Sequence, residues 1–160
     1  MNRYDDFNRI RATVMGLGRF GGGVAVARWL AEKRAAVTVC DTADEESLRE
    51  SIGELADCRI DAFHFGPHRE EDFREADLVV VNPAVRPGNP MLEVARRGGA
   101  RVTSEIELFM RHCPGEITAV TGSNGKSTTA AMIAAIYRAA GRRTYLGGNI
   151  AAVCSDRSTK

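Results

Sequence analysis

The residues best suited to chemistry lie together in one glycine-rich loop, Gly122-Ser123-Asn124-Gly125-Lys126-Ser127-Thr128. The apolar "EITAVTG" before it predicts a strand over 116–122, and the alanine-rich "STTAAMIAAIYRAAG" after it predicts a helix ending at Gly141. In a strand–loop–helix of this kind, backbone N–H groups and the helix dipole hold the phosphates of a nucleotide. The spacing predicts that Lys126 reaches the β- and γ-phosphates and that the Ser127 hydroxyl ligates Mg²⁺.

The loop departs from the general phosphate-loop pattern in one position and allows one alternative. Val120 stands six residues before Lys126, where the general pattern has glycine. Asn124-Gly125 is also a strong hairpin dipeptide, but a hairpin needs a strand to follow. The segment that follows instead has an apolar helical face made of Ala130, Ile133, Ile136, Tyr137 and Ala140. The phosphate loop is therefore the better interpretation.

A second glycine-rich turn lies near the start of the chain, Gly16-Leu17-Gly18-Arg19-Phe20-Gly21. It matches the dinucleotide fingerprint G-x-G-x-x-G, and Asp41 ends the next predicted strand, where an acidic residue would meet a ribose hydroxyl. The pattern predicts nucleotide binding but does not choose between NAD and another nucleotide. A purely structural turn, with Asp41 exposed at a strand end, is the alternative.

Short apolar strands alternate with helices along the chain. Strands are predicted over 12–18, 36–41, 59–66, 77–83, 100–104 and 116–122, and helices over 19–35, 89–99, 104–113 and 127–141. This alternation predicts an α/β fold: a Rossmann-like, mostly parallel sheet, followed by the first β-P-loop-α unit of a second α/β domain. Cys113-Pro114-Gly115 is the expected boundary, which gives domains 1–113 and 114–160.

Composition argues against several classes of protein. The chain has 160 residues, 44% of them hydrophobic, and a formal net charge of +1, so no charge excess points to nucleic acid or a membrane surface. No apolar stretch is long enough for a membrane span or a signal peptide, and we expect a cytoplasmic protein. The four cysteines are scattered with no CxxC pair, which predicts reduced thiols.

The segment "VTGSNGKSTT" resembles the ATP loop of the Mur ligases, in the form typical of the branch that adds D-glutamate. "GLGRFG", "SEIELF" at 104–109 and "GGNI" at 147–150 resemble further elements of that family in the same order. The resemblance covers 11–150 and leaves 151–160 outside it. It implies an ATP-dependent ligase with an acyl-phosphate mechanism, which uses ATP and Mg²⁺ to join D-glutamate to UDP-N-acetylmuramoyl-L-alanine in cytoplasmic peptidoglycan precursor synthesis.

The resemblance also assigns residues to two sites. The first domain would bind the UDP group rather than NAD, through Gly18, Arg19, Phe20, Asp41, Thr42, Asn82 and Asn149. The ATP site would comprise 122–128, with Lys126 catalytic and Ser127 on the metal. Two positions depart from the family: Ala43 replaces a frequent arginine, and "NPAV" at 82–85 replaces Ser-Pro-Gly-[ILV], so that Ala84 lacks the backbone freedom of glycine.

Several parts of the family have no counterpart in this sequence, among them its metal-binding glutamate and histidine, its carbamylated lysine and its D-glutamate domain. We therefore expect a truncated, inactive form of a ligase that is a monomer when complete. We also expect 142–160 to be mobile, and the helix over 126–140 to persist only if it packs on the first domain. A non-catalytic nucleotide-binding module is the alternative. A small NAD-dependent dehydrogenase would leave 119–150 unexplained.

Overall fold

The computed structural model describes residues 6–18, 22–147 and 152–156. It divides into two compact units, Met1–Glu107 and Leu108–Lys160, each of which is described by itself. The division falls inside helix α5 (Glu105–His112). The assignment of a UDP-substrate domain to 1–113 and of an ATP domain to 114–160 stays a prediction.

The first unit contains a five-stranded parallel sheet in the order β3-β2-β1-β4-β5. The strands are β1 (Arg11–Met15), β2 (Ala36–Asp41), β3 (Ala62–Phe65), β4 (Leu78–Val81) and β5 (Arg101–Ser104). In this register Met15 lies opposite Cys40 of β2 and Val81 of β4. The order is that of a doubly wound nucleotide-binding fold, which confirms the predicted α/β class.

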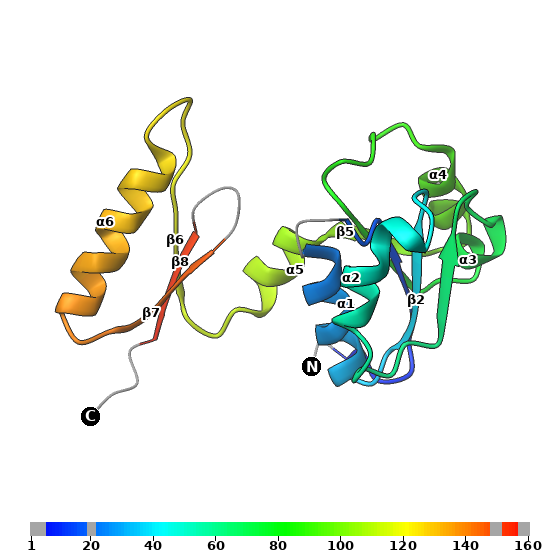
Figure 1. Ribbon diagram of the computed structural model, residues 1–160, viewed down its shortest axis with the longest axis horizontal. Coiled ribbons are helices and arrows are strands. Elements are labelled where there is room, and N and C mark those ends of the chain that lie inside the picture. The colour runs from blue at the N-terminus through cyan, green and yellow to red at the C-terminus, as the bar shows by residue number, and fades with distance from the viewer. Residues whose placement is uncertain (1–5, 19–21, 148–151, 157–160) are drawn as a thin grey trace. The chain divides into compact units, whose positions relative to one another are not determined.

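Helices cover both faces of this sheet (Figure 1). Helix α1 (Gly22–Glu32) contacts β1 and β2, and a short turn η1 (Glu46–Leu48) leads into α2 (Arg49–Gly53). Helices α3 (Glu70–Arg74) and α4 (Pro90–Arg97) pack on each other and share a hydrophobic cluster with Met15, Cys40 and Val79. Because both faces are covered, the central strands are continuous apolar runs rather than alternating ones.

The helix ends follow the capping residues. The Asn89 side chain accepts a hydrogen bond from the Met91 N–H (2.9 Å) at the start of α4, and Gly99 past its end has a left-handed φ of 87°, as is common where a helix stops at glycine. Ser104 Oγ accepts from the Glu107 N–H (3.3 Å) at the start of α5. The Glu107 carboxylate accepts from the Thr103 hydroxyl (2.7 Å).

The second unit contains a three-stranded sheet in the order β6-β8-β7, in which the central strand β8 (Ala152–Asp156) is antiparallel to β6 (Glu116–Ala119) and to β7 (Arg143–Gly147). Helix α6 (Lys126–Ala139) lies along one face of this sheet and contacts β7 and β8 (Figure 1). Its packed face is narrow: Ala130 and Ala134 are fully buried, with Val120, Ile133 and Tyr137 around them.

The structure corrects three expectations about this unit. Residues 143–147 and 152–156 form strands instead of a mobile segment, and the rest of the expected mobile range beyond 147 lies outside the described residues. Helix α6 packs on the sheet of its own unit, where β8 joins β6 and β7 into one surface, whereas the expectation had it pack on the first domain. Ile136, predicted on the packed face, is 64% exposed. Within the described ranges, no helix is long and apolar enough to cross a membrane.

Candidate nucleotide-binding sites

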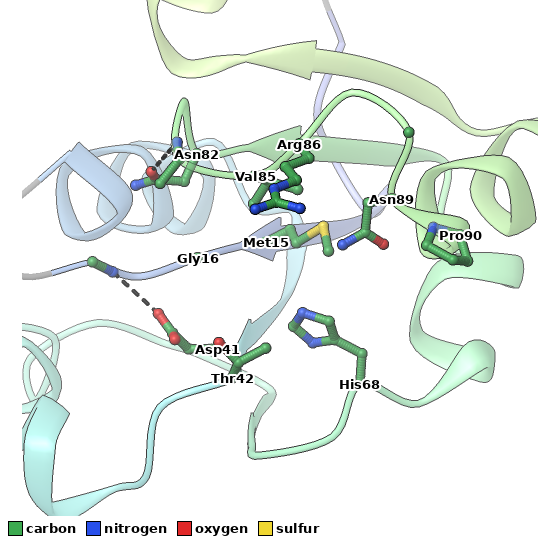
Figure 2. Close-up of a pocket in the computed structure, with 13 residues that line it drawn as sticks. Met15, Gly16, Asp41, Thr42, His68, Asn82, Val85, Arg86, Asn89 and Pro90 are labelled. Carbon is green, nitrogen blue, oxygen red and sulfur yellow. Dashed lines mark hydrogen bonds between the residues drawn. The ribbon is translucent and has the colours of Figure 1, made fainter.

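A pocket of about 680 Å³ opens in the first unit where β1, β2 and β4 end (Figure 2). The chain runs from β1 outward through β2 and β3 on one side, and then returns past β1 to add β4 and β5 on the other side, so the strand order reverses at β1. Open α/β sheets bind ligands at such a switch point, outside the carboxyl ends of the strands. Four of the predicted UDP-site residues line this pocket: Gly18, Asp41, Thr42 and Asn82.

The Asp41 side chain holds the glycine turn in place. Its Oδ2 accepts hydrogen bonds from the N–H groups of Leu17 (2.9 Å) and Gly18 (3.2 Å), and its Oδ1 accepts from the Ala43 N–H (2.9 Å). Figure 2 shows the bond to the turn. The carboxylate therefore occupies amides that a dinucleotide fold leaves for its pyrophosphate. Asp41 is partly buried at the end of β2 rather than fully exposed, and its contact with a ribose or uracil stays a prediction.

The glycines of the turn are needed for different reasons. Gly16 and Gly18 have left-handed φ values of 92° and 68°, and a Cβ at Gly16 would lie 2.7 Å from the Asn82 Cβ. Gly23 in the first turn of α1 packs on the backbone of the turn, because a Cβ there would lie 2.3 Å from the Leu17 carbonyl oxygen. A methyl group at Gly22 would overlap the Glu105 carboxylate. The turn, α1 and the β4–α4 loop are thus closely packed.

The segment 82–85 accommodates its departure from the family pattern. Asn82 Oδ1 accepts from the Ala84 N–H (3.0 Å), and the Asn82 carbonyl accepts from the Val85 N–H (3.0 Å). Ala84 is not among the described non-glycine residues with positive φ. Its backbone therefore lies in a region open to any residue, and the expected problem with alanine at this position does not arise.

The pocket lining also includes three polar or charged residues that the sequence did not predict for this site: His68, Arg86 and Asn89. His68 packs edge-on against the buried Phe73 ring, with centroids 5.5 Å apart, and its Nδ1 is buried with no hydrogen-bond partner among the described residues. Burial lowers the pKa of the His68 imidazole, while the nearby Asp41 and Asp72 carboxylates partly oppose the shift. The ring is therefore neutral at pH 7, with one nitrogen donor and one acceptor.

A polar cluster of Cys40, His64 and Asp72 lies under the sheet beside the pocket, with ligand-type atoms within 4.8 Å of one another. His64 Nδ1 lies 2.7 Å from Asp72 Oδ2, and the Arg69 guanidinium donates to His64 Nε2 (3.2 Å). Arginine cannot accept, so Nδ1 carries the proton and donates to Asp72. Burial raises the pKa of the Cys40 thiol, and the nearby Asp72 carboxylate raises it further, so the thiol stays protonated. Hydrogen bonds therefore account for the cluster without a metal ion.

The second candidate site is the loop between β6 and α6. Gly125 is the N-cap of α6 and has a left-handed φ of 75°, which favours glycine, and the Thr129 N–H donates to the Gly125 carbonyl (2.9 Å). No side chain caps the helix at this residue, and its first turn contains no acidic residue. The residues from Gly122 to Gly125 are exposed. The N-terminus of this helix is therefore open to an anion, as the sequence predicts for a phosphate loop.

The Lys126 side chain folds over this loop. Its ammonium donates to the carbonyls of Gly122 (2.5 Å) and Ser123 (3.2 Å). These bonds hold the positive charge against the backbone of the loop and leave one ammonium hydrogen free. Ser127 and Thr128 are exposed in the first turn of α6, so their hydroxyls are accessible.

Three of the predicted UDP-site residues, Arg19, Phe20 and Asn149, lie outside the described residues. For the others, the structure gives positions. Gly18, Asp41, Thr42 and Asn82 come together around one pocket of the first unit, and 122–128 form one loop of the second unit. The assignment of these residues to UDP, ATP and Mg²⁺ stays a prediction.

The fold and the two sites define a class: an α/β protein with a doubly wound parallel sheet, and a glycine-rich loop with lysine at the start of a helix in a second unit. Comparison with sequence families gives two matches. The Mur ligase MurD-like N-terminal domain matches residues 10–104, and the Mur ligase middle domain matches residues 120–160. The chain belongs to the Mur ligase family, with a MurD-like N-terminal domain. The second match reaches residue 160, so the expectation that similarity stops at 150 is wrong.

Curated relatives agree with this family. The chain is 46% identical over 140 residues to the UDP-N-acetylmuramoylalanine--D-glutamate ligase of Roseiflexus sp. (strain RS-1), covering 88% of this chain and 30% of the relative. It is also 46% identical over 140 residues to the ligase of the same name from Trichlorobacter lovleyi, covering 88% and 31%. The chain thus spans about 30% of the length of these relatives.

Among solved structures, the chain is similar to the UDP-N-acetylmuramate:L-alanyl-gamma-D-glutamyl-meso-diaminopimelate ligase from Neisseria meningitides. The TM-score is 0.51 at 21% identity, and the match covers 83% of this chain and 40% of that one. At this identity the likeness concerns the fold alone. It agrees with the α/β architecture described above.

Proposed function

We propose that this chain is the part of a D-glutamate-adding Mur ligase that binds two nucleotides: the UDP group of UDP-N-acetylmuramoyl-L-alanine and the triphosphate of ATP. The observation that carries the proposal is the geometry of the phosphate loop: the Lys126 ammonium is bonded to a loop carbonyl, and no side chain caps the start of α6. The pocket at the switch point of the first unit supports a second nucleotide site. The names of the curated relatives supply the substrate class.

The hydrogen bonds of Asp41 bear on how a nucleotide can lie in the first unit. In a dinucleotide fold, the amides of the glycine turn hold the pyrophosphate and the acidic residue binds a ribose. Here the Asp41 carboxylate occupies the Leu17 and Gly18 amides. A second negative group at those amides would repel this carboxylate. A ligand of this pocket is therefore placed to approach from the β4–α4 loop, which offers Asn82, Arg86 and Asn89.

The residues of the second unit fit ATP with Mg²⁺. Lys126 supplies a point charge for the β- and γ-phosphates, and the amides at the start of α6 supply donors. Magnesium usually keeps several water ligands and takes few from the protein, so the exposed Ser127 hydroxyl fits it as one ligand. When bound, Mg²⁺ would neutralise charge on the phosphates.

The proposed reaction is the ligation that the family performs in cytoplasmic peptidoglycan precursor synthesis. A carboxylate oxygen of the muramoyl-alanine substrate attacks the γ-phosphorus, the bond to the bridging oxygen breaks, and ADP leaves. The amine of D-glutamate attacks the carbonyl of the acyl phosphate, loses a proton, and phosphate leaves as the amide forms. This chain's contribution is to hold the first substrate by its UDP group and to stabilise the charge that develops on the γ-phosphoryl group through Lys126.

Calorimetric titration of the chain with UDP and with NAD tests the site in the first unit. We expect UDP to bind and NAD to bind at least tenfold more weakly. Tight NAD binding without UDP binding would contradict the proposal.

Titration with ATP and Mg²⁺ tests the site in the second unit. Lys126→Ala should raise the Kd for ATP by about 10- to 100-fold, because a charge-assisted contact to phosphate is typically worth about 1.5–3 kcal/mol. Lys126→Arg should also bind ATP more weakly than the wild type, since a planar guanidinium is bulkier than the ammonium that contacts the loop. Lys33→Ala, which removes an exposed lysine that follows α1 in the first unit, is the control. An unchanged Kd for Lys126→Ala would mean that the loop is structural.

A further inference from the structure

The β4–α4 loop, residues 82–89, forms one wall of the pocket and is rigidly built. It begins with the two turn bonds of Asn82 and ends with the Asn89 cap of α4, and the Asn89 N–H donates to the Arg86 carbonyl (3.0 Å). These bonds fix the backbone on both sides of Arg86. The Arg86 side chain is therefore presented from a defined position, although the side chain is itself exposed.

The polar groups of this wall are hydrogen-bond donors without acceptors. The side-chain oxygens of Asn82 and Asn89 are engaged by backbone N–H groups, which leaves both amide NH₂ groups free. Within the described part of the chain, the Arg86 guanidinium has neither a hydrogen bond nor an ion pair. By contrast, Arg28, Arg74 and Arg96 each pair with a carboxylate. Figure 2 shows the Arg86 guanidinium turned into the pocket toward Met15, between Asn82 and Asn89.

The charge balance of the pocket requires a cation if an anionic ligand is to bind. Asp41 contributes a negative charge to the lining, and the Glu105 carboxylate lies against Gly22 at the start of α1. His68 is neutral at pH 7, since burial lowers its pKa. Arg86 is thus the one permanent positive charge among the residues that line the pocket in the described structure. Among the described lining residues, it is the group that can offset the Asp41 charge for a phosphate.

We propose that Arg86, flanked by the amide groups of Asn82 and Asn89, binds the diphosphate of a nucleoside-diphosphate-linked substrate and gives the pocket its preference for nucleoside diphosphates over nucleosides. The proposal rests on the proposed UDP site of the first unit and names the residue that recognises the charge. A guanidinium presents two parallel donors that match phosphate oxygens. Because the side chain is exposed, water and salt weaken this contact relative to a buried one.

Titration of the whole 160-residue chain at low ionic strength with UDP and with uridine tests this role. We expect Arg86→Ala to raise the Kd for UDP by about tenfold and to leave the Kd for uridine within about twofold. Arg86→Lys should lie between alanine and wild type, because the charge remains and the fork is lost. Added salt should weaken UDP binding more in the wild type than in Arg86→Ala. Arg97→Ala, which removes an exposed arginine from the far end of α4, is the control and should bind UDP as the wild type does.

The outcomes separate this inference from the function on which it rests. If the wild type binds neither UDP nor uridine, the proposed UDP site fails, and the role of Arg86 fails with it. If the wild type binds UDP and Arg86→Ala binds it equally well, only the role of Arg86 is wrong. Equal losses for UDP and uridine would show a role in the shape of the pocket, and a loss in Arg97→Ala would show a general effect of net charge. Either result overturns the proposal, and so does an Arg86→Lys variant that binds UDP no more tightly than Arg86→Ala.

Discussion

Replacing Asp41 should loosen the glycine turn that shapes the pocket. The carboxylate accepts from the Leu17 and Gly18 N–H groups at 2.9 and 3.2 Å, and both bonds are partly buried. Hydrogen bonds to charged groups contribute about 1.5–3 kcal/mol when buried, and we reduce this to about 1 kcal/mol each for partial exposure. Asp41→Ala should therefore lower the free energy of unfolding of the first unit by about 2 kcal/mol. Asp41→Asn should cost about half as much, because its amide oxygen still accepts.

The chain provides its own probe for this measurement, since Trp29 on α1 is its one tryptophan. Urea unfolding followed by Trp29 fluorescence reports on the first unit, and UDP titration of the same variants reports on the pocket. Glu45→Ala removes a carboxylate from an exposed position near Asp41 and should match the wild type. If Asp41→Ala unfolds within about 0.5 kcal/mol of the wild type and binds UDP equally well, the carboxylate does not hold the turn.

Two further predictions use the same fluorescence signal. Gly23→Ala should destabilise the first unit by about 2 kcal/mol through overlap with the Leu17 backbone, whereas Gly53→Ala meets nothing within 4 Å and should be neutral. Equal stability of the two variants would show that the α1 contact is not close. Because burial lowers the pKa of His68 from its usual 6.5, the folded state favours the neutral ring. The neutral His68 ring therefore contributes to the stability of the fold above pH 6.5, and this contribution should be lost as the pH falls through the lowered pKa. The wild type should lose more free energy of unfolding than His68→Gln between pH 7.5 and 5.5, and a loss no larger than that of the variant would refute this.

The sequence by itself determined most of the first unit. Strands β1, β2 and β4 are short β-branched or aliphatic runs, and such runs indicate buried strands wherever they fold. Glycines past α4 and at the start of α6 mark backbone conformations that other residues rarely adopt. These signals depend only on residues that are neighbours in the chain, so they can be read from a single sequence. The phosphate loop belongs to the same kind, since its residues are contiguous.

Other elements carried no usable local signal. Helix α3 has five residues, too few for a periodic pattern, and it is held by the packing of Phe73 in the cluster under the sheet. Strand β8 pairs with strands on both sides, and that pairing cannot be read from its own five residues. The packed face of α6 was also misassigned from the sequence: Ile136, which was predicted on it, is exposed, whereas Ala134 is buried.

The site itself was decided by tertiary structure. Asp41 ends a strand in the sequence, but only the pairing of β1 with β2 brings its carboxylate to the amides of the turn. His68 and Arg86 lie in separate loops with no motif, and they meet at one pocket because β1 lies between β2 and β4. Strand order depends on contacts between residues far apart in the chain. A sequence therefore specifies the residues that can bind a nucleotide, while the order of the strands decides which of them face the same pocket.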